Sequence, residues 1–181
     1  MNMKQAKTLN ERELKAVFVQ IGTRRFAARD RAIVAVSYYA GLRAKEIAAL
    51  TVGDVYDEQG SVREQFALDA VQTKGAKTRT VWINAKLRRQ LELYRSSLLF
   101  KDSNRALFQS QKGGAFSANT MTQLFLNIYR AAGFENASSH SGRRSLATTL
   151  CNKGVNIRLI QKIGGWSSLQ SVTTYLDANE E

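Results

Sequence analysis

A set of widely separated side chains in this sequence could act together on a phosphate group. Two are arginines, one is a lysine, one is the single histidine of the chain, and one is a tyrosine near the end of the sequence, with a tryptophan nine residues before it. Phosphoryl transfer depends mainly on positioning and on cations that stabilise charge, which side chains of these types supply. The set comprises Arg43 in GLRAKE, Lys74 in QTKGAKTR, His140 and Arg143 in HSGRR, Trp166 in GGWSS and Tyr175 in SVTTYL.

Each member of the set has a distinct chemical capability. Arg43 and Arg143 offer planar, bidentate donors suited to the non-bridging oxygens of one phosphate. His140 lies three residues before Arg143, about one helical turn away on the same side, where it can donate to the phosphate or handle a proton. Lys74 can protonate a departing alkoxide, and Tyr175 can attack phosphorus and form a covalent phosphoenzyme.

Each residue by itself also has an ordinary structural explanation. An arginine after the end of a helix is usually a solvated surface charge, and a lysine at a hairpin tip usually solvates the edge of a sheet. A lone histidine at a helix start is more often a cap or a core residue than a catalyst, and a tyrosine in an apolar helix usually packs. Only the combination points to chemistry.

The elements that must position these residues are mainly helical. Asn10 is a candidate N-cap followed by acidic residues, and Leu14, Val17 and Ile21 then recur at helical spacing. Gly41 is the expected stop of a buried helix. Further cap candidates are Asn84, Asn156 and the serines at 138 and 139. These patterns predict helices over 8–22, 28–41, 43–50, 84–100, 118–132, 138–154, 156–165 and 167–178.

Residues 60–83 have a different pattern, with β-branched and aromatic residues on both sides of a break at Gly75. This pattern predicts two or three antiparallel strands with a turn near residues 74–78. No linker rich in glycine, serine and proline divides the chain. We therefore predict a single domain over residues 1–181, mainly α-helical with a small antiparallel β-sheet, in the α+β class.

The charge of the chain indicates a polyanionic partner. Its 27 lysines and arginines exceed its 15 aspartates and glutamates, which gives a net charge of +12 and a sequence pI of about 10.1. The basic residues are spread along the sequence, which favours a folded basic surface over a disordered arm. Nucleic acid is the first expected partner, and a membrane surface is the second.

The same composition excludes several kinds of site. The single cysteine, Cys151, forms no disulfide within the chain, and one cysteine with one histidine cannot make a Cys/His zinc site. The N-terminus lacks an apolar signal sequence, and the most apolar run, AIVAVSYYAGL, is shorter than the about 20 apolar residues that a membrane span needs. We therefore predict a soluble cytoplasmic protein.

Four stretches, in this order, resemble the motifs of the tyrosine recombinases, the phage integrase family. GLRAKEIAALTVGDV resembles the first arginine box, TKGAKTRTVWI the β-hairpin lysine segment, HSGRRSLATTL the His-x-x-Arg box, and GGWSSLQSVTTY the final box that ends in the nucleophile. The resemblance covers about residues 29–176. It implies the catalytic-domain fold of that family, in which the helix carrying the nucleophile closes the domain.

The resemblance also implies a role for each member of the set. Arg43 and Arg143 would clamp the scissile phosphate, and His140 would assist proton transfer and phosphate binding. Lys74 would be the general acid for the leaving 5′-oxygen, with Lys77 as a nearby competitor for that role.

Three further residues complete the implied site. Tyr175 would be the nucleophile. Trp166, at a position where the family has histidine or tryptophan, would donate its indole N–H to the phosphate and pack against the site. Glu46 matches the acidic residue after the first arginine and would support the residues that touch the phosphate. The implied reaction uses no metal and no nucleotide cofactor. It needs no external energy source, because the bond energy is kept in the phosphotyrosine.

The sequence departs from the family pattern in three places. Gly142 stands where a leucine is common before the second arginine, which bears on helix packing there. Trp166 in place of histidine removes one acid–base group. The N-terminal DNA-clamping domain of most members is expected to be absent, and only LDANEE follows Tyr175. We therefore expect weak, poorly selective DNA binding, and no exchange of C-terminal helices between subunits.

The implied function is that of a site-specific DNA recombinase or integrase of a mobile element, which cuts and rejoins strands through a 3′-phosphotyrosyl intermediate. Two alternatives stay open: a non-catalytic DNA-binding regulator with the same fold, and a type IB topoisomerase-like enzyme that relaxes DNA. The expected partners are double-stranded DNA and, on DNA, further copies in a tetramer or an accessory recombination protein, with no membrane. The predicted location is the cytoplasm, with nucleoid association when the protein is bound to DNA.

Overall fold

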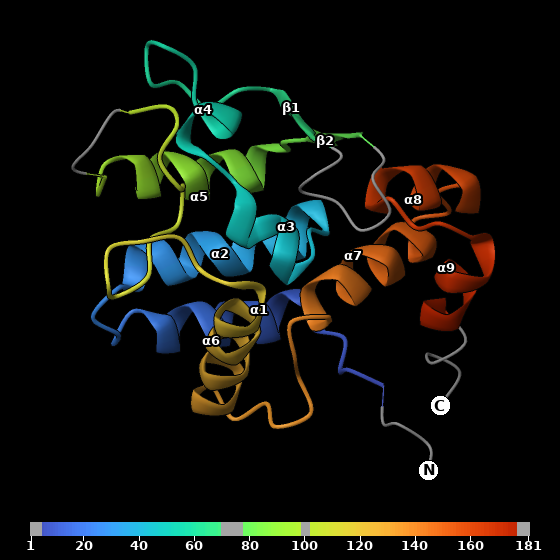
Figure 1. Ribbon diagram of the computed structural model, residues 1–181. Coiled ribbons are helices and arrows are strands. Elements are labelled where there is room, and N and C mark those ends of the chain that lie inside the picture. Colours follow the sequence, from blue (N-terminus) through green and yellow to red (C-terminus); the bar gives the residue numbers. More distant parts are fainter. Residues whose placement is uncertain (1–4, 70–77, 99–101, 177–181) are drawn as a thin grey trace.

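The structure is a computed structural model that describes residues 5–69, 78–98 and 102–176, although not the side chains of the last two. This part of the chain contains nine helices and one two-stranded antiparallel sheet (Figure 1), so the predicted class, mainly α with a small antiparallel sheet, is confirmed. The elements are α1 (Glu11–Ile21), α2 (Ala27–Ala40), α3 (Ala44–Ala49), α4 (Val52–Val55), β1 (Gln65–Leu68), β2 (Arg79–Trp82), α5 (Ala85–Arg95), α6 (Ala118–Ala131), α7 (Ser141–Asn152), α8 (Ile157–Gly164) and α9 (Leu169–Leu176).

Local sequence accounts for the ends of several helices. The Asn10 side chain accepts from the backbone N–H of Glu13, and the Glu13 carboxylate accepts from the backbone N–H of Asn10, so a capping box begins α1. Asn84 and Asn156 cap α5 and α8, as predicted. Gly41 ends α2 with a φ of 67°, a left-handed conformation that glycine adopts without steric penalty.

Helix α2 lies within the main hydrophobic core. It packs against α1, α3, α5 and α7, while α6 packs against α1 and α3. The helix buries apolar side chains on all sides, among them Ile33, Val34 and Val36, so it has no exposed polar face along this run. Arg29 and Asp30 are also buried, and they pair with an N–O distance of 2.7 Å. The main core therefore surrounds the helix that ends at Gly41, directly before the first candidate arginine.

The sheet is a single hairpin with one inward face. Phe66 lies opposite Val81, and Leu68 lies opposite Arg79, in antiparallel register. Phe66, Leu68 and Val81 are buried, and side chains alternate along a strand, so Arg79 is on the inward side with them. Two antiparallel strands match the prediction. The predicted turn near residues 74–78 falls almost entirely outside the described residues.

The last three helices enclose a second, smaller hydrophobic cluster on one side of the main core (Figure 1). Its buried members are Ala147 of α7, Ile160 of α8, Val172 of α9, and Trp166 between α8 and α9. These helices pack against one another, and α7 also packs along α2.

Gly142 explains how α7 comes so close to α2. A Cβ at this position would lie 2.5 Å from Oγ of Ser37 and 2.8 Å from the Ser37 carbonyl carbon. A leucine, which is common at this position in the resembling family, would therefore collide with the α2 backbone. The glycine at 142 and the small Ser37 together permit the close contact between the two helices.

Three details differ from the prediction. Helix α4 is outside the predicted set; the backbone N–H groups of its first two residues, Val52 and Gly53, donate to carbonyls of Arg105 and Ser103, far along the chain. Helix α5 ends at Arg95, before the predicted end at residue 100. His140, rather than a serine, is the N-cap residue of α7. In residues 5–69, 78–98 and 102–176, no helix is long and apolar enough to cross a membrane.

Candidate functional site

Arg43 lies at the turn between α2 and α3, where it is the N-cap residue of α3. Its Nη1 donates to Oε1 of Glu46 at 2.8 Å, and its backbone N–H donates to Oε2 of the same carboxylate at 2.8 Å. Its Nη2 donates to the carbonyl oxygen of Gly165 at 3.1 Å. Because the side chain is still 25% exposed, these contacts orient a guanidinium group that solvent can reach.

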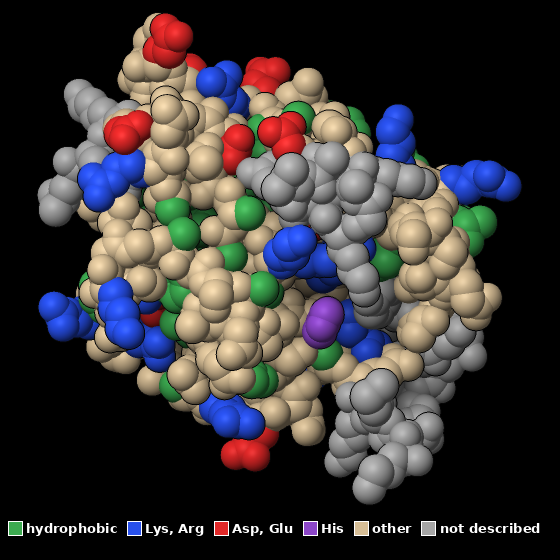
Figure 2. All heavy atoms as spheres, viewed as in Figure 1, with side chains coloured by type: hydrophobic (Ala, Val, Ile, Leu, Met, Phe, Trp, Pro, Cys, Tyr) green, Lys and Arg blue, Asp and Glu red, His purple; other side chains and the backbone are tan. Residues whose placement is uncertain are grey.

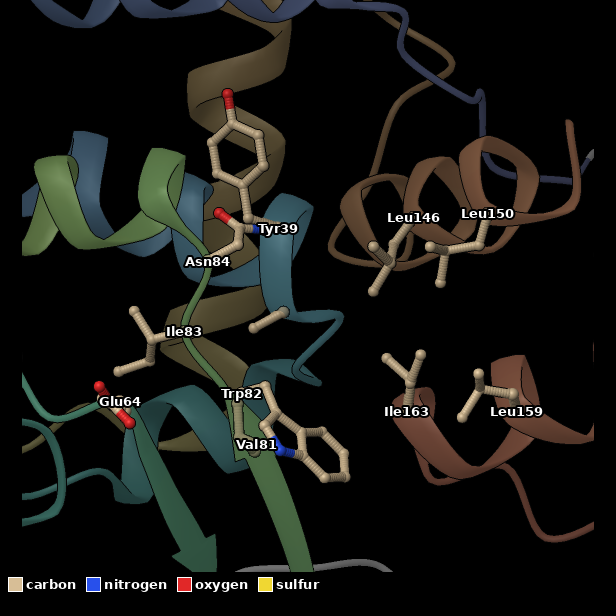
Figure 3. A pocket seen from close by; sticks show the side chains of 11 residues that line it. Tyr39, Glu64, Val81, Trp82, Ile83, Asn84, Leu146, Leu150, Leu159 and Ile163 are labelled. Carbon is tan, nitrogen blue, oxygen red and sulfur yellow. The ribbon is translucent and has the colours of Figure 1, made fainter. Parts of the chain in front are cut away.

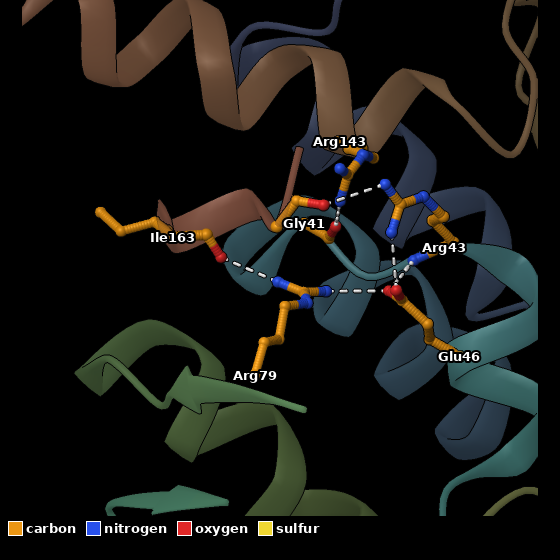
Figure 4. Close-up of polar contacts among 7 residues, drawn as sticks. Gly41, Arg43, Glu46, Arg79, Arg143 and Ile163 are labelled. Atoms are coloured by element: carbon orange, nitrogen blue, oxygen red, sulfur yellow. Dashed lines mark hydrogen bonds and ion pairs between the residues drawn. The ribbon is translucent and has the colours of Figure 1, made fainter. Parts of the chain in front are cut away.

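Arg143 reaches the same place from α7 and is almost completely buried. Its Nη1 donates to the carbonyl oxygen of Gly41 at 2.6 Å. Its guanidinium carbon lies 4.0 Å from the centre of the Trp166 ring, in a cation–π contact. Gly41 is two residues before Arg43, and the two guanidinium groups lie close together (Figure 4).

Trp166 occupies the turn between α8 and α9, and two glycines make its position possible. A Cβ on Gly164 would lie 1.7 Å from Cζ3 of the indole ring. Gly165 has a φ of 64°, and a Cβ there would lie 2.5 Å from Cδ of Arg79. The two glycines therefore leave room for an indole on one side and an arginine on the other.

His140 occupies the N-cap position of α7 near the two arginines, without a capping hydrogen bond from its side chain. The residue is exposed, yet neighbouring protein atoms still remove part of its hydration. This partial burial, followed by the positive charges of Arg143 and Arg43, lowers the pKa of His140 below its ordinary value. Figure 2 shows the histidine beside basic side chains in a hollowed part of this face. Two cations, one of them buried, and an exposed pH-sensitive donor thus converge on one site.

Comparison with known proteins identifies the family. The profile of the phage integrase family matches residues 7–181 of this chain. The chain belongs to the phage integrase family.

Relatives and solved structures agree with this assignment. Tyrosine recombinase XerD from Pseudomonas putida is 34% identical over 152 residues, which cover 81% of this chain and 49% of XerD. The crystal structure of XerA recombinase covers 96% of this chain and 61% of that chain, with a TM-score of 0.77 at 26% identity. The structure of XerH site-specific recombinase bound to difH substrate, a pre-cleavage complex, covers 97% and 51%, with a TM-score of 0.70 at 26% identity.

The fold is therefore that of a tyrosine recombinase catalytic domain. The chain spans about half the length of the curated relatives it matches, 49% for XerD of Pseudomonas putida and 51% for XerC of Myxococcus xanthus.

Sequence motifs did not single out Arg79, although the structure joins it to this integrase-family site. Its Nη2 donates to Oε2 of Glu46 at 2.8 Å, and the Glu46 side chain is only 1% exposed. Burial by itself raises the pKa of Glu46. The charge of Arg79, the backbone hydrogen bond from Arg43 and the charges of Arg43 and Arg143 together outweigh it and hold this pKa below its ordinary value. The sequence does contain a sign that Arg79 points inward. Side chains alternate along a strand, and Arg79 lies two residues before the apolar Val81, so the two side chains share one face.

Three candidate residues are not seen in contact with this cluster. Lys74 and its competitor Lys77 lie outside the described residues. Tyr175 lies in α9, but its side chain is not among those described. Helix α9 packs against α7 and α8, so the backbone at Tyr175 belongs to the same group of helices as Arg143.

Two cavities lie apart from the candidate residues. One of about 380 Å³ has Trp82, Leu146 and Leu159 in its lining (Figure 3), and one of about 630 Å³ lies beside α4. Neither is lined by Arg43, His140, Arg143 or Trp166. The members that solvent reaches, Arg43 and His140, thus lie on a more open surface, which suits a macromolecule better than an enclosed small ligand. Among the residues that the structure describes, no group of three or more His, Cys, Asp or Glu side chains could hold a metal ion.

Proposed function

We propose that this chain, as one domain over residues 1–181, is the catalytic domain of a site-specific DNA recombinase that cuts and rejoins strands. The observation that carries the proposal is the convergence of Arg43, which solvent reaches, and the buried Arg143 on one site, with His140 and Trp166 beside them. Two guanidinium groups suit the non-bridging oxygens of a phosphodiester. Similarity to recombinases, including one seen with its difH substrate, supports DNA as the substrate.

In the proposed reaction, the phenolic oxygen of Tyr175 attacks phosphorus and forms a 3′-phosphotyrosyl bond. The bond from phosphorus to the 5′-oxygen breaks, and Lys74 gives that oxygen the proton it needs to leave as a hydroxyl. His140 assists transfer of the phenolic proton, while Arg43, Arg143 and the indole N–H of Trp166 bind the phosphate. Rejoining runs in reverse: a 5′-hydroxyl attacks the phosphotyrosine and releases the tyrosine.

Positive charge has two consequences in this reaction. The side-chain cations stabilise the negative charge that develops on the phosphate, and they also pair with Glu46. Separately, the phosphotyrosine keeps the bond energy, so the proposed reaction consumes no nucleotide. Glu46 contributes by holding Arg43 in place through a 2.8 Å ion pair.

The proposed partner is double-stranded DNA, which suits the net charge of +12. Phosphate contacts position a protein without reading sequence, so binding by this domain should be weak and fall steeply with salt, by roughly 0.9 in log affinity per unit of log salt for each phosphate neutralised. We further propose that copies assemble into a tetramer only on paired DNA sites, or act with an accessory recombination protein. Such a protein would be cytoplasmic and associated with the nucleoid when bound to DNA.

Capture of a covalent protein–DNA adduct tests the proposal. A library of nicked duplexes lets the short strand with the 5′-hydroxyl leave after cleavage, so the adduct accumulates. Wild-type protein should form the adduct with or without chelator. Tyr175→Phe should form none, while its DNA affinity stays within about twofold, because only a hydroxyl is removed.

The alternative outcomes separate the rival functions. Adduct formation by Tyr175→Phe would identify another nucleophile. Binding of DNA by the wild-type protein without any adduct would favour a non-catalytic regulator. Loss of cleavage in chelator, restored by magnesium, would move the chain to a different class of nuclease.

A sulfur substitution distinguishes Lys74 from Lys77. When sulfur replaces the bridging 5′-oxygen, the leaving group no longer needs a general acid. Lys74→Ala should therefore cleave normal DNA slowly and the sulfur substrate at close to the wild-type rate. Rescue of Lys77→Ala instead would assign the role to Lys77.

A further inference from the structure

Arg79 is a charged residue in an unusual place, at the start of β2 on the inward side of the hairpin. Its side chain is only 10% exposed, and it lies opposite the buried Leu68 in the sheet register. Burial of a guanidinium group is costly unless its donors are paired. The contacts that pair it should therefore reveal what this arginine does.

Two contacts connect Arg79 with two other segments of the chain (Figure 4). Nη1 donates to the carbonyl oxygen of Ile163 at 2.8 Å, and Nη2 donates to Oε2 of Glu46 at 2.8 Å. Ile163 belongs to the last turn of α8, where helix carbonyls lack partners within the helix. Arg79 therefore joins the hairpin to α3 on one side and to the C-terminal end of α8 on the other.

Each of these segments carries part of the candidate site. Glu46 holds Arg43 through its other carboxylate oxygen, Oε1, at 2.8 Å. The end of α8 leads through Gly165 to Trp166, whose ring lies against Arg143. A shift of Arg79 would thus move the support of Arg43 and the turn that carries Trp166 together.

The charges in this group give Arg79 a second effect. The carboxylate of Glu46 has one negative charge, and it pairs with two guanidinium groups, those of Arg43 and Arg79. Without Arg79, the same buried carboxylate would neutralise Arg43 one-to-one. By sharing the carboxylate, Arg79 leaves net positive charge at Arg43, where an anion would bind.

We propose that Arg79 is a positioning residue of the phosphate site, which acts through Glu46 on Arg43 and through Ile163 on the turn that carries Trp166. This inference rests on the proposed function. Arg79 itself has no contact with the DNA in this proposal; it determines where the residues that touch the phosphate lie.

The test compares adduct formation by Arg79→Gln, Arg79→Lys and a matched control. The rate is measured at saturating nicked DNA, and affinity is measured separately. Arg79→Gln should lower the rate by roughly 100-fold, as expected for a small misplacement of reacting groups, and change the affinity less than about threefold. Arg79→Lys should recover part of the rate, because it keeps a charge beside Glu46 but not both contacts.

Arg88→Gln is the control for loss of a structural arginine. Arg88 donates to the carbonyl oxygens of Val62 and Arg63, away from the site. This variant should keep the wild-type rate at temperatures where it is folded. An equal loss of rate in Arg79→Gln and Arg88→Gln would overturn the proposal, as would a loss in Arg79→Gln that lies entirely in affinity.

A double variant covers the case in which Arg79→Gln does not fold. Glu46→Gln combined with Arg79→Gln leaves no unpaired buried charge from this pair. Its rate should be higher than the product of the two single effects, since the two residues share one contact, and lower than that of Glu46→Gln alone, since the contact to Ile163 is also lost. Full multiplication of the two single effects would contradict a role exerted through Glu46.

A measurement without DNA separates this inference from the proposed function. In a Trp82→Phe background the remaining indole N–H signal belongs to Trp166, because the chain has two tryptophans. Arg79→Gln should shift that NMR signal, and Arg88→Gln should leave it in place. If the wild-type protein forms no adduct, the proposed function fails, but an unshifted Trp166 signal is what would refute the role of Arg79.

Discussion

The main core and the C-terminal helices differ in what holds them together. The main core brings together apolar side chains from α1 to α6 and from both strands, and Ile33, Leu42 and Ile47 in it are fully buried. Among the described side chains, the cluster of α7, α8 and α9 has four buried apolar members, Ala147, Ile160, Trp166 and Val172. Because apolar burial is the main source of folding free energy, the smaller cluster should depend more on its contacts with the main core.

Besides the packing of α7 along α2, polar contacts at the candidate site join the two regions. Arg143 donates to Gly41, Arg43 donates to Gly165, and Arg79 donates to Ile163. In each case a buried or half-buried arginine on one side pairs with a backbone carbonyl on the other. The residues proposed to bind phosphate therefore also fasten the two regions to each other, so that assembly of the site and docking of α7 to α9 are one event.

The largest expected effect comes from removing one isoleucine in each region. Ile33 of α2 and Ile160 of α8 are both completely buried. Ile33→Ala should lower the free energy of unfolding by about 4 kcal/mol and Ile160→Ala by about 2 kcal/mol, because the smaller cluster can collapse around the lost volume. Denaturant titration gives both values.

Native-state hydrogen exchange extends this comparison. Ile160→Ala should speed exchange of amides in α8 and α9 and leave those of α2 nearly unchanged, whereas Ile33→Ala should affect both regions. Equal effects of both variants on α2 would show that the protein opens as one unit.

A smaller loss is expected from closing the gap between α2 and α7. In Gly142→Ala the new Cβ would meet backbone atoms of Ser37 and Tyr38 at 2.8 and 2.9 Å. Backbone atoms cannot turn aside, so the helices should separate at a cost of about 1–3 kcal/mol, reduced by the better helix propensity of alanine. Gly114→Ala is the matched control, because a Cβ there meets nothing within 4 Å. Equal denaturation midpoints for the two variants would contradict the close contact.

Gly164→Ala should lower the free energy of unfolding less than Gly142→Ala does, but it should lower the rate of adduct formation strongly. Its Cβ would lie 1.7 Å from the Trp166 ring, and a side chain can rotate away where backbone cannot. We expect a loss of about 1 kcal/mol in unfolding free energy, but a rate of adduct formation about 100-fold lower, since Trp166 and Arg143 would no longer stack. Gly114→Ala again serves as the control. A normal rate in Gly164→Ala would remove Trp166 from the proposed phosphate site.

The smallest effect concerns protonation of His140. The imidazole should titrate below its ordinary value of 6.5 in the wild-type protein, and Arg43→Gln should raise that pKa by removing one of the charges that lower it. One histidine in the chain makes NMR titration direct. Since the folded-state pKa is lowered, the unfolded chain binds this proton more readily, and stability should fall as the pH falls from 6.5 to the folded pKa. If the pKa of His140 is unchanged in Arg43→Gln, the charge of Arg43 has no effect on the imidazole and this prediction is wrong.

Elements specified by local chemistry were predictable from sequence. Asn10, Asn84 and Asn156 cap their helices and Gly41 stops α2, because a cap needs only a side chain and the next few backbone N–H groups. Helix α4 was outside the prediction, although Thr51 and Asp54 form a local capping box at its start. Its first N–H groups find their partners in the segment around Arg105, and four residues carry too little periodicity to predict a helix.

The candidate site divides in the same manner. The sequence shows the types and the order of the six candidate residues, Arg43, Lys74, His140, Arg143, Trp166 and Tyr175. The motifs around them resemble those of the phage integrase family, and the family profile confirms this membership. Their roles stay proposals, and Lys74 and the Tyr175 side chain lie outside the described residues. Arg79 has no separate motif signal, because it lies five residues after Lys74, which by itself accounts for the hairpin motif.

The sequence by itself thus determined the kinds of side chain, their order and most helix boundaries, since these depend on neighbours along the chain. Only the tertiary structure decided that Arg79 meets Glu46 at 2.8 Å, 33 residues away, and Ile163 at 2.8 Å, 84 residues away. The tertiary structure also decided that Gly142 and Gly164 must lack a side chain. A Cβ at Gly142 would collide with the α2 backbone, and a Cβ at Gly164 would collide with the indole ring of Trp166. Hydrogen bonds and steric contacts depend on separations of a few tenths of an ångström, and spacing along a sequence does not specify distances that small between remote segments.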